Sequence, residues 1–455
     1  LLSFPTRLSY DLVNTTASNN TAVGNNSMNC NTTGASNTAV GRYALYENTT
    51  ANNNTAIGFC ALMDNTTGTG NTASGNRALE NNTTASNNTA LGYYALNTNT
   101  TGHSNTGIGQ GALQATTDGD QNVAVGNGAL TTATTAGSNT AVGHDALGDT
   151  TTGGQNNAFG DGAMDKNTTG CRNVAMGNSA LFKNTEGLCN TALGHITLYD
   201  NTTGDNNVAV GGGALSNNTT ANDNTSVGCG SLLDNTTGAC NTAVGTGALA
   251  NNTTGAENTA VGSAAMLNST IGCKNTFIGR NSGRDNTEGD ENVAIGFNSG
   301  CQNTTGDNNA MIGNFAQSSS TTVSNEFTLG NGNTNNLRCA DTSISSLSDL
   351  RDKKNIEYIP HGLDYILAIR PVKFDWDTRD GTRKGKKDYG FIAQELDQVE
   401  ETFGNKEYTR LVSKENPEQW ETDPMKTYPI LIKAIQELSE ENKDLKSRIE
   451  SLESN

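Results

Sequence analysis

The chain has 455 residues, of which 33% are hydrophobic, 5% aromatic and 16% charged, and 52 are glycines. Globular domains contain roughly 45–50% apolar and about 25% charged residues, so this chain cannot close conventional globular cores over its whole length. The formal net charge is −18. This acidic balance argues against a nucleic-acid groove, which needs clustered Lys and Arg to neutralise phosphates. The composition favours a regular architecture with a thin core, such as a solenoid or a fibre.

The charge is distributed unevenly along the chain. Residues 349–455 hold 18 basic and 23 acidic side chains, whereas residues 1–348 hold only 10 basic and 23 acidic ones. No stretch of about 20 apolar residues occurs, so no membrane-spanning segment is expected. The change in composition, together with the patterns described next, predicts five segments: a lead-in (1–13), a repeat shaft (14–338), a linker (339–348), a small domain (349–425) and a C-terminal coiled-coil helix (426–455).

The shaft repeats with a period of 17 residues and the consensus N-T-A-V-G-x-x-A-L-x-x-N-T-T-G-x-x. Asn fills all 18 positions of one column, from Asn20 to Asn309, and Gly fills the 19 positions from Gly24 to Gly330. Columns locked in phase predict stacked coils of one unit, here a parallel β-solenoid. We expect the Asn column to form a side-chain ladder along the axis and the Gly column to form a corner of each coil.

The orientation of the strand residues decides what each coil buries. Alternation along Thr-Ala-Val-Gly places Ala and Val on opposite faces, and we expect Val and Leu to fill the interior. The Ala columns, which include Ala78, Ala95 and Ala112, would then lie on an outer face where neighbouring chains approach closely. This predicts identical chains packed around a common axis, most simply a homotrimer. A monomeric solenoid is the alternative.

The columns of residues 14–330 resemble the head repeats of trimeric autotransporter adhesins, which implies a parallel β-roll. An ice-binding β-solenoid with a flat Thr array is an alternative interpretation. A polysaccharide-cleaving enzyme would need paired carboxylates, and the acidic residues of the shaft are scattered singly. The nine cysteines form no CxxC pair. Cys171 and Cys189 are candidates for a disulfide between coils, with free thiols as the alternative. No metal and no cofactor is expected.

Four motifs follow the shaft in order. The first runs from Ser348 to Ile356, and the others occupy residues 366–376, 389–396 and 428–438. Together they resemble the peptidase S74 family, the intramolecular chaperone domain of endosialidase tailspikes and other viral fibres. The resemblance implies a C-terminal domain that trimerises, directs the folding of the fibre ahead of it and then cuts itself off, with no activity on external substrates.

The resemblance also implies the site of the cut, between Ser348 and Asp349, with Ser348 and Lys353 as the catalytic pair. A Lys removed from water can lose its proton and activate a Ser hydroxyl without a His. Attack by Ser348 on its own carbonyl would close a strained four-membered ring. The Ser of a neighbouring chain and the carboxylate of Asp349 are therefore alternative nucleophiles. Three residues are candidate accessory residues: Asn355 in the first motif, and Gln394 and Glu395 in the family signature. For Gln394 and Glu395 we expect a structural role, with a part in catalysis as the alternative.

The last 28 residues carry a heptad pattern. Apolar positions alternate in steps of three and four residues, which predicts a helix with an oligomer seam. Asn442 in the seam would fix the register. The order of Ile and Leu favours two strands in isolated parallel coils, whereas the family resemblance favours three. The seam residues are Tyr428, Leu431, Ile435, Leu438, Asn442, Leu445, Ile449 and Leu452.

These features predict a homotrimeric fibre or tailspike-like shaft on the surface of a virus particle, used for surface presentation or host attachment. Its expected partners are copies of itself, other virion proteins, and a host receptor or glycan. A trimeric adhesin at a cell surface or outside the cell is the alternative.

Overall fold

The structure is a computed structural model that describes residues 16–334, 348–378, 384–404, 406–414 and 420–454. The chain divides into two compact units, Leu1–Thr328 and Leu329–Asn455. The expected lead-in (1–13) and residues 339–347 of the expected linker lie outside the described residues. Within the described residues, no helix combines the length and the apolar character that a membrane span requires.

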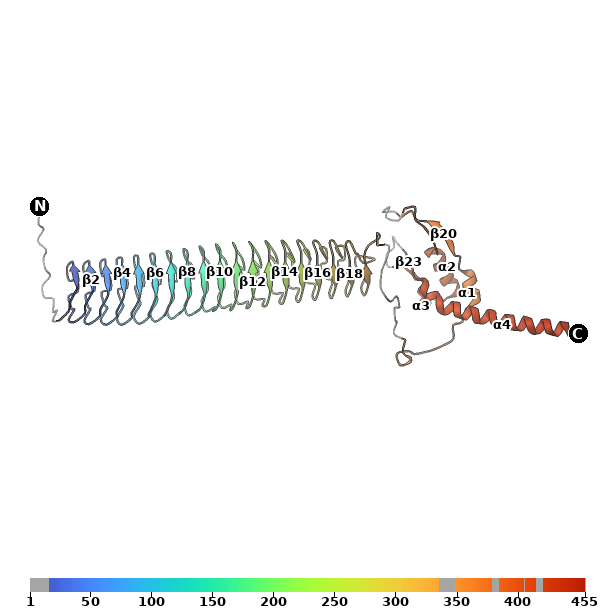
Figure 1. The fold of residues 1–455 in the computed structure, drawn as a ribbon, viewed down its shortest axis with the longest axis horizontal. Helices are drawn as coiled ribbons and strands as arrows, with labels where there is room; N and C mark the ends of the chain where they lie inside the picture. The colour runs from blue at the N-terminus through green and yellow to red at the C-terminus, as the bar shows by residue number, and fades with distance from the viewer. Residues whose placement is uncertain (1–15, 335–347, 379–383, 405, 415–419, 455) are drawn as a thin grey trace. The chain divides into compact units, whose positions relative to one another are not determined.

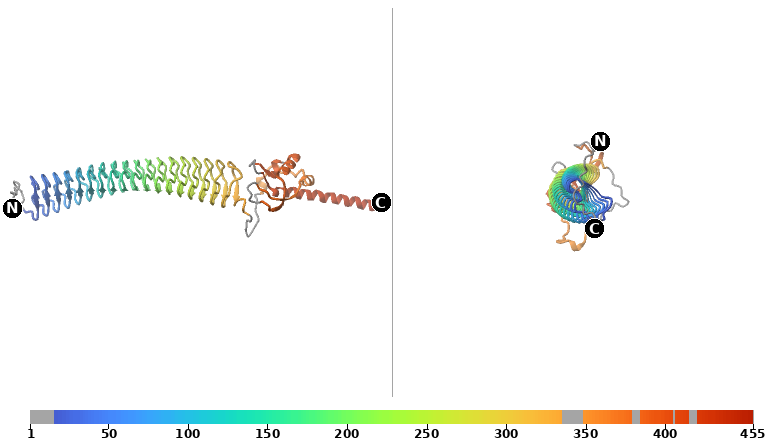
Figure 2. Two further views of the ribbon diagram at one scale, coloured as in Figure 1. Left: turned by 90° about the horizontal axis from the view of Figure 1, so that it is seen from above. Right: turned by 90° about the vertical axis from the view of Figure 1, so that its left-hand side faces the viewer.

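The first unit is a parallel β-solenoid, which confirms the predicted fold class (Figure 1). Each coil contributes one strand of three residues to a single 19-stranded sheet. Residues 17 positions apart lie opposite each other in neighbouring strands, as Thr38 does with Thr55. Figure 2 shows that the stack of coils bends gently along its length.

The strands of this sheet are β1 (Thr21–Val23), β2 (Thr38–Val40), β3 (Thr55–Ile57), β4 (Thr72–Ser74), β5 (Thr89–Leu91), β6 (Thr106–Ile108), β7 (Val123–Val125), β8 (Thr140–Val142), β9 (Asn157–Phe159), β10 (Val174–Met176), β11 (Thr191–Leu193), β12 (Val208–Val210), β13 (Thr225–Val227), β14 (Thr242–Val244), β15 (Thr259–Val261), β16 (Thr276–Ile278), β17 (Val293–Ile295), β18 (Ala310–Ile312) and β19 (Phe327–Leu329).

A Gly ends each strand from β1 to β19 and forms the predicted corner. Gly58, for example, has a φ of 138°, a conformation that L-residues rarely adopt. A Cβ on Gly58 would also overlap the carbonyl oxygen of Gly75 in the next coil. The Gly column is therefore required both by the backbone conformation and by the close stacking of the coils.

The predicted orientation of the strand residues is wrong. In β2 to β18 the middle residue, usually Ala, is fully buried, as Ala141 is, whereas the aliphatic third residue points outward: Ile57 is 44% exposed. The prediction that Leu lies inside is right, since Leu79 is fully buried. Ala78, Ala95 and Ala112 are fully buried as well, so they form no outer face for chain contacts.

The physical reason for this orientation is the narrow interior of the coil. In β6 the strand Ala is replaced by Gly107, and a Cβ there would lie 3.4 Å from Cδ1 of Leu96. The strand residue thus faces the core Leu directly across the coil. One large side chain fills each layer, so the opposite wall must supply a small residue.

Two ladders of Asn side chains run through the solenoid, and the first confirms the predicted one. In that ladder Oδ1 of Asn156 accepts the N–H of Asn173 at 2.9 Å, and Nδ2 of Asn156 donates to the carbonyl of Gly170 at 2.8 Å. The second ladder comes from the N-T-T-G turns, where Nδ2 of Asn218 donates to Oδ1 of Asn201 at 2.8 Å. These amides are buried, and their hydrogen bonds hold the coils in one register.

Two coils near the end of the stack carry Gly283 and Gly300 in place of the core Leu. The middle residues of the strands next to them are larger than Ala. They are Phe277 in β16 and Met311 in β18, and both are fully buried. A Cβ on Gly283 would overlap the Phe277 ring, and one on Gly300 would lie 2.9 Å from Cε of Met311. The side-chain volume lost at the core Leu position is replaced by the larger residue at the middle strand position. The interior of the coil therefore stays filled where the consensus changes.

The described cysteines of the shaft are free thiols. Cys171 and Cys189 are not bridged, although the N–H of Cys189 donates to the carbonyl of Cys171 at 3.1 Å. Cys339 lies outside the described residues.

The second unit is a small α+β region that ends in a long helix (Figure 1). Strands β20 and β21 pair antiparallel, as do β22 and β23. A compact core joins α1, α2 and α4 through Tyr365, Val399, Leu411 and Ile430. The elements are η1 (Leu350–Asp352), α1 (Leu363–Ala368), β20 (Val372–Asp375), β21 (Lys387–Gly390), α2 (Ala393–Phe403), α3 (Lys406–Thr409), β22 (Val412–Ser413), β23 (Glu421–Thr422), η2 (Pro424–Thr427) and α4 (Tyr428–Glu453).

Helix α4 is attached to this core through its first turns. Ile430 and Ala434 are buried, and Glu437 accepts the N–H of Leu363 at the start of α1, with 2.6 Å between N and Oε2. Gly362 makes this approach possible, because a Cβ there would lie 2.9 Å from the backbone nitrogen of Ala434. The remainder of α4 extends beyond these contacts with its side chains exposed.

Candidate functional site

The structure places Ser348 and Lys353 side by side. Nζ of Lys353 donates a hydrogen bond to Oγ of Ser348 at 2.6 Å. The single turn of η1 produces this contact by folding the intervening chain back, and the N–H of Lys353 donates to the carbonyl of Leu350 at 3.2 Å. Both side chains are exposed in the single chain. An amine in direct contact with a hydroxyl is the arrangement that a Ser-Lys nucleophile requires.

The neighbouring carboxylate of Asp349 is engaged by Arg351. Its Oδ1 accepts the backbone N–H of Arg351 at 2.9 Å and Nε at 3.0 Å, and its Oδ2 accepts Nη2 at 2.6 Å. The hydrogen bonds from the Arg351 side chain hold the pKa of Asp349 below its usual range. Three donors therefore keep this carboxylate ionised and fixed in place. Sequence reasoning did not single out Arg351, although Asp at a helix start followed by a basic residue was a usable signal.

The candidate accessory residues lie apart from this pair. Asn355 is exposed, with a left-handed φ of 53°, and Gln394 is exposed in the first turn of α2. Among the described residues, no hydrogen bond links either of them to Ser348 or Lys353. The structure assigns them no contact with the reacting atoms.

Glu395, the third accessory candidate, binds Arg370 instead. Nε of Arg370 donates to Oε2 at 2.9 Å, and Nη2 donates to Oε1. This bidentate pair lowers the pKa of Glu395 through the hydrogen bonds from Arg370. It joins α2 to the segment between α1 and β20, which is a positioning role within the fold.

A second carboxylate of α2, which sequence reasoning missed, lies in the interior. Glu400 is fully buried. Its Oε1 accepts the N–H of Leu411 at 2.7 Å and the hydroxyl of Thr409 at 2.5 Å. These bonds attach the segment before β22 to α2. Its sequence signal was weak, because an acidic residue in an amphipathic helix is usually exposed.

The heptad residues form an exposed stripe on α4. Ile435 is 66% exposed, Leu445 51% and Leu452 76%. The buried residues of the same helix, Ile430 and Ala434, lie in other heptad positions. A stripe of Ile and Leu left open to water on a 26-residue helix indicates a surface that a partner covers.

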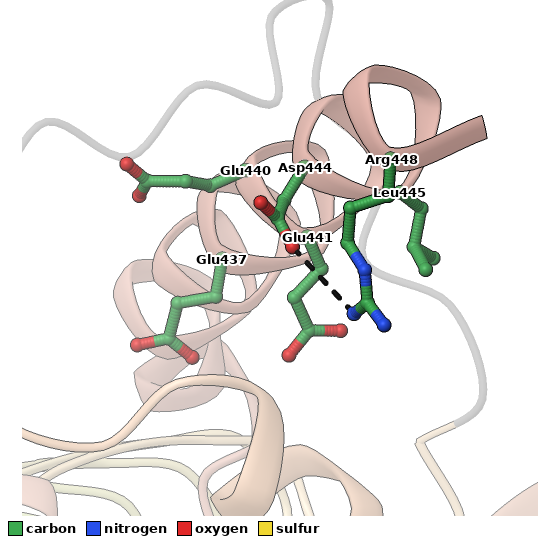
Figure 3. A pocket seen from close by; sticks show the side chains of 6 residues that line it. All are labelled: Glu437, Glu440, Glu441, Asp444, Leu445 and Arg448. Atoms are coloured by element: carbon green, nitrogen blue, oxygen red, sulfur yellow. Dashed lines mark ion pairs between the residues drawn. The ribbon is translucent and has the colours of Figure 1, made fainter. Parts of the chain in front are cut away.

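Polar residues flank this stripe, as Figure 3 shows for Glu437, Glu440, Glu441, Asp444 and Arg448 around Leu445. Nη1 of Arg448 lies 4.0 Å from Oδ2 of Asp444, and an exposed pair of this kind contributes about 1 kcal/mol or less. In the heptad, Glu441 and Arg448 occupy g positions, and Lys446 and Glu453 occupy e positions. A parallel, in-register coiled coil would place Glu441 near Lys446 of the next chain and Arg448 near its Glu453. Both pairs have opposite charge.

Comparison with known proteins relates the segment that contains the Ser348–Lys353 pair to a known family. Residues 348–405 match the family model Peptidase_S74, described as the chaperone of endosialidase. No curated protein and no solved structure matches the chain. The matched residues begin at Ser348 and end after α2, so neither the solenoid nor α4 belongs to them. The C-terminal region of this chain therefore carries a peptidase S74 segment, an endosialidase-type chaperone, behind a long β-solenoid shaft.

Proposed function

We propose that the protein is a homotrimeric fibre or tailspike-like shaft whose C-terminal region promotes trimer folding and then releases itself by cutting between Ser348 and Asp349. The observation that carries the proposal is the 2.6 Å hydrogen bond between Lys353 and Ser348 at the first residue of the family match. A long solenoid ahead of such a segment fits surface presentation or host attachment on a virus particle. The partners would be other virion proteins and a host receptor or glycan.

The cut proceeds through an ester between chains. The neutral amine of Lys353 takes the proton of the Ser348 hydroxyl, and Oγ attacks the carbonyl carbon of Ser348 in a neighbouring chain. The C–N bond to Asp349 breaks, and the leaving amine takes the proton back from Lys353. Water then hydrolyses the ester, which frees the Ser348 hydroxyl and leaves a new carboxylate at the end of the shaft.

The geometry favours Ser348 over Asp349 as the nucleophile. A carboxylate that accepts three hydrogen bonds from Arg351 must break them before it can attack, whereas the Ser348 hydroxyl already contacts an amine. Attack across chains also avoids the four-membered ring that attack within one chain would require.

Assembly supplies the condition that a single chain lacks. Ser348 and Lys353 are both exposed to water, whereas a Lys that activates a nucleophile is typically desolvated. Cover by neighbouring chains would remove the pair from water and favour the neutral amine. Cleavage is therefore proposed to follow trimer formation, so that the chaperone leaves only after the shaft has folded.

The first test is the mass of the products. Expressed whole, the chain should yield a fragment of 107 residues that begins at Asp349. Ser348→Ala should leave the chain intact because it removes the nucleophile, and Lys353→Ala should do so because it removes the base. Lys354→Ala is the matched control and should cut as the parent does. Intact-mass spectrometry reads all four proteins, and efficient cutting in Ser348→Ala would refute the mechanism.

The dependence on assembly is tested in the seam of α4. Changing Leu438 and Leu445 to Asp should block both trimer formation and cutting, whereas Ser447→Asp, on the outer side of the helix, should leave both in place. Light scattering and mass spectrometry on the same samples separate the two effects. A monomeric seam variant that still cuts would contradict the coupling, and a monomeric parent chain would contradict the trimer itself.

A further inference from the structure

The solenoid presents one face that differs from the rest of its surface. We call it the strand face and define it as the first and third residues of strands β1 to β19. The third residue is apolar in every strand except β4, where it is Ser74. The first residue is Thr or Val in most strands, and none of the 19 strands contains a charged residue. The strand face is therefore an uncharged, largely apolar stripe along the whole stack.

The charged residues of the shaft lie in other positions of the coil. They follow the Gly corner or lie in the turns, where they pair between coils and within them. Lys166 lies 2.9 Å from Asp149 in the preceding coil, and Lys183 lies 2.6 Å from Asp200 in the following one. These parts of the coil have the composition of a surface in contact with water, and the strand face does not.

The strand face is open in the single chain. Met176 is 49% exposed and Ile278 39%, although the coils above and below each of these residues cover part of it. Of the 18 apolar positions, 11 are exposed and seven are half-buried. Their exposed areas sum to on the order of 1,000 Å², about what one partner contributes to a stable protein interface. Soluble proteins rarely leave a continuous apolar surface of this size uncovered.

We propose that the strand face is the surface through which copies of this chain pack against one another, parallel and in register. The inference rests on the trimer of the proposed function and identifies which face of the shaft forms it. A partner that covers the stripe must be as long as the shaft and must repeat at the same spacing, and a second copy of the chain meets both requirements. The exposed heptad stripe on α4 would also pack against copies of this chain, because it belongs to the same polypeptide as the shaft.

The side chains of the third column vary in a way that suits packing between proteins. Ser74, Phe159 and Met176 interrupt a column of Val, Ile and Leu. In a symmetric, in-register assembly each residue meets its own copy, so a large side chain in one layer needs only local adjustment. An ice-binding surface would need a regular array at every step, and these changes break it.

The first experiment compares the reactivity of two engineered thiols in the full chain, one on the strand face and one off it. In a background with the native cysteines changed to Ser, Val244→Cys places a thiol on the strand face and Ile271→Cys places one in a turn. Both parent side chains are exposed in the single chain, 37% and 50% respectively. The Val244→Cys thiol should react with a maleimide at least about tenfold more slowly than the Ile271→Cys thiol, and oxidation should link chains only through the former.

The outcomes separate this inference from the proposed function. A trimer in which both thiols react at the same rate, without cross-linking at position 244, would overturn the strand-face interface and leave the trimer standing. A monomer would overturn both.

A second comparison keeps the native cysteines. Val244→Lys with Ile278→Lys should lower the melting temperature of the shaft by about 10 °C or more, because charges would enter the interface. The control pair Ile196→Lys with Ile271→Lys, at positions off the strand face that are 36% and 50% exposed, should change it little. Equal effects of the two pairs would contradict the proposal. Thermal hysteresis of a monomeric chain, lost in the strand-face variant, would assign the face to ice instead.

Discussion

A single Asn in the first ladder links three coils through its backbone and its side chain. The N–H of Asn156 donates to Oδ1 of Asn139, its own Oδ1 accepts the N–H of Asn173, and its Nδ2 reaches the carbonyl of Gly170. Other residues of similar size lack an acceptor and a donor in this geometry. That explains why the column stays Asn from Asn20 to Asn309 while neighbouring columns vary.

Asn156→Ala is expected to destabilise the shaft strongly. The substitution leaves the N–H of Asn173 buried without its acceptor, which costs about 1–3 kcal/mol. It also removes one of the two donors to the carbonyl of Gly170, which keeps Nδ2 of Asn167 at 3.1 Å, and the lost bond costs about 0.5–1.5 kcal/mol. The free energy of unfolding should therefore fall by about 2–4 kcal/mol. Asn76→Ala is the control: Asn76 is exposed, and the described residues give its side chain no hydrogen bond.

Denaturant titration followed by circular dichroism measures both variants, and hydrogen exchange locates the effect. Faster exchange should concentrate in the coils next to residue 156, because each coil contacts only its neighbours. Equal midpoints for Asn156→Ala and Asn76→Ala would show that the ladder does not stabilise the stack.

The sequence could predict the Asn ladder but not the orientation of the strands. An invariant amide at a fixed period has few uses other than stacking. Alternation, in contrast, shows only that Ala141 and Val142 point in opposite directions. Which of them lies inside depends on the width of the coil and on Leu147 across it, and neither property is local in sequence. The assumption that the larger residue is buried was therefore wrong.

At the scale of the coil, burial and backbone strain compete at the core Leu. Leu79 has a φ of 51°, in the left-handed region, which costs about 1–2 kcal/mol for an L-residue. Burying a Leu side chain gains about 1.5–3 kcal/mol, so Leu is retained where the interior needs its volume. Where Phe277 fills the interior, Gly283 takes the position with a φ of 59° and without that strain.

Because burial and strain compete here, we predict that the consensus Leu destabilises the shaft at position 283. Gly283→Leu restores the repeat pattern but forces a side chain into the Phe277 ring, so it should cost about 1–3 kcal/mol. Phe277→Ala alone should cost about 3–5 kcal/mol through the cavity that it leaves. The double variant Phe277→Ala with Gly283→Leu rebuilds the usual coil and should be close to the parent in stability.

Thermal denaturation of the three variants measures the coupling between the two positions. A double variant whose loss equals the sum of the two single losses would contradict the exchange of volume between the columns. Met311 and Gly300 offer an independent repeat of the same comparison in the last coils.

The α4 and η1 elements show what the sequence determines about the second unit. The heptad spacing alone predicts a helix and its seam, because the pattern is periodic over four turns or more. The contact between Ser348 and Lys353 depends on one short turn at Leu350–Asp352, and a spacing of five residues permits several backbone paths. The sequence motif therefore pointed to Ser348 and Lys353 as candidates, but only the structure shows the turn of η1 that brings their side chains together.

Over the whole molecule, the two units are stabilised by different interactions and should respond differently to acid. In the second unit the backbone N–H of Leu363 and the side chain of Lys433 lower the pKa of Glu437, and Arg370 lowers that of Glu395. The ladders of the shaft consist of neutral amides, which do not titrate in this range. Carboxylates whose pKa is lowered by folding stabilise the folded state fully above their unfolded value, about 4.5 for Glu.

This stabilisation is lost as the pH falls through the lower folded values. Between pH 7 and about pH 3, the helical signal of the second unit should therefore decrease before the β signal of the shaft, as circular dichroism can follow. Glu437→Gln should weaken the second unit at pH 7 and reduce its sensitivity to acid, whereas Glu440→Gln, at an exposed position, should do neither. A shaft that unfolds first on acidification would contradict the assignment.

Because every coil has 17 residues, the length of the shaft can change by whole coils without a change in the structure of a coil. The bonds of the first ladder recur with the period of the coil, so the loss of one whole coil brings equivalent ladder atoms together. Near-identical repeats in a gene also recombine in phase, which adds or removes whole coils. Each event changes the length of the shaft by about 4.8 Å, so its length can vary in small, regular steps while the sequence at either end stays the same.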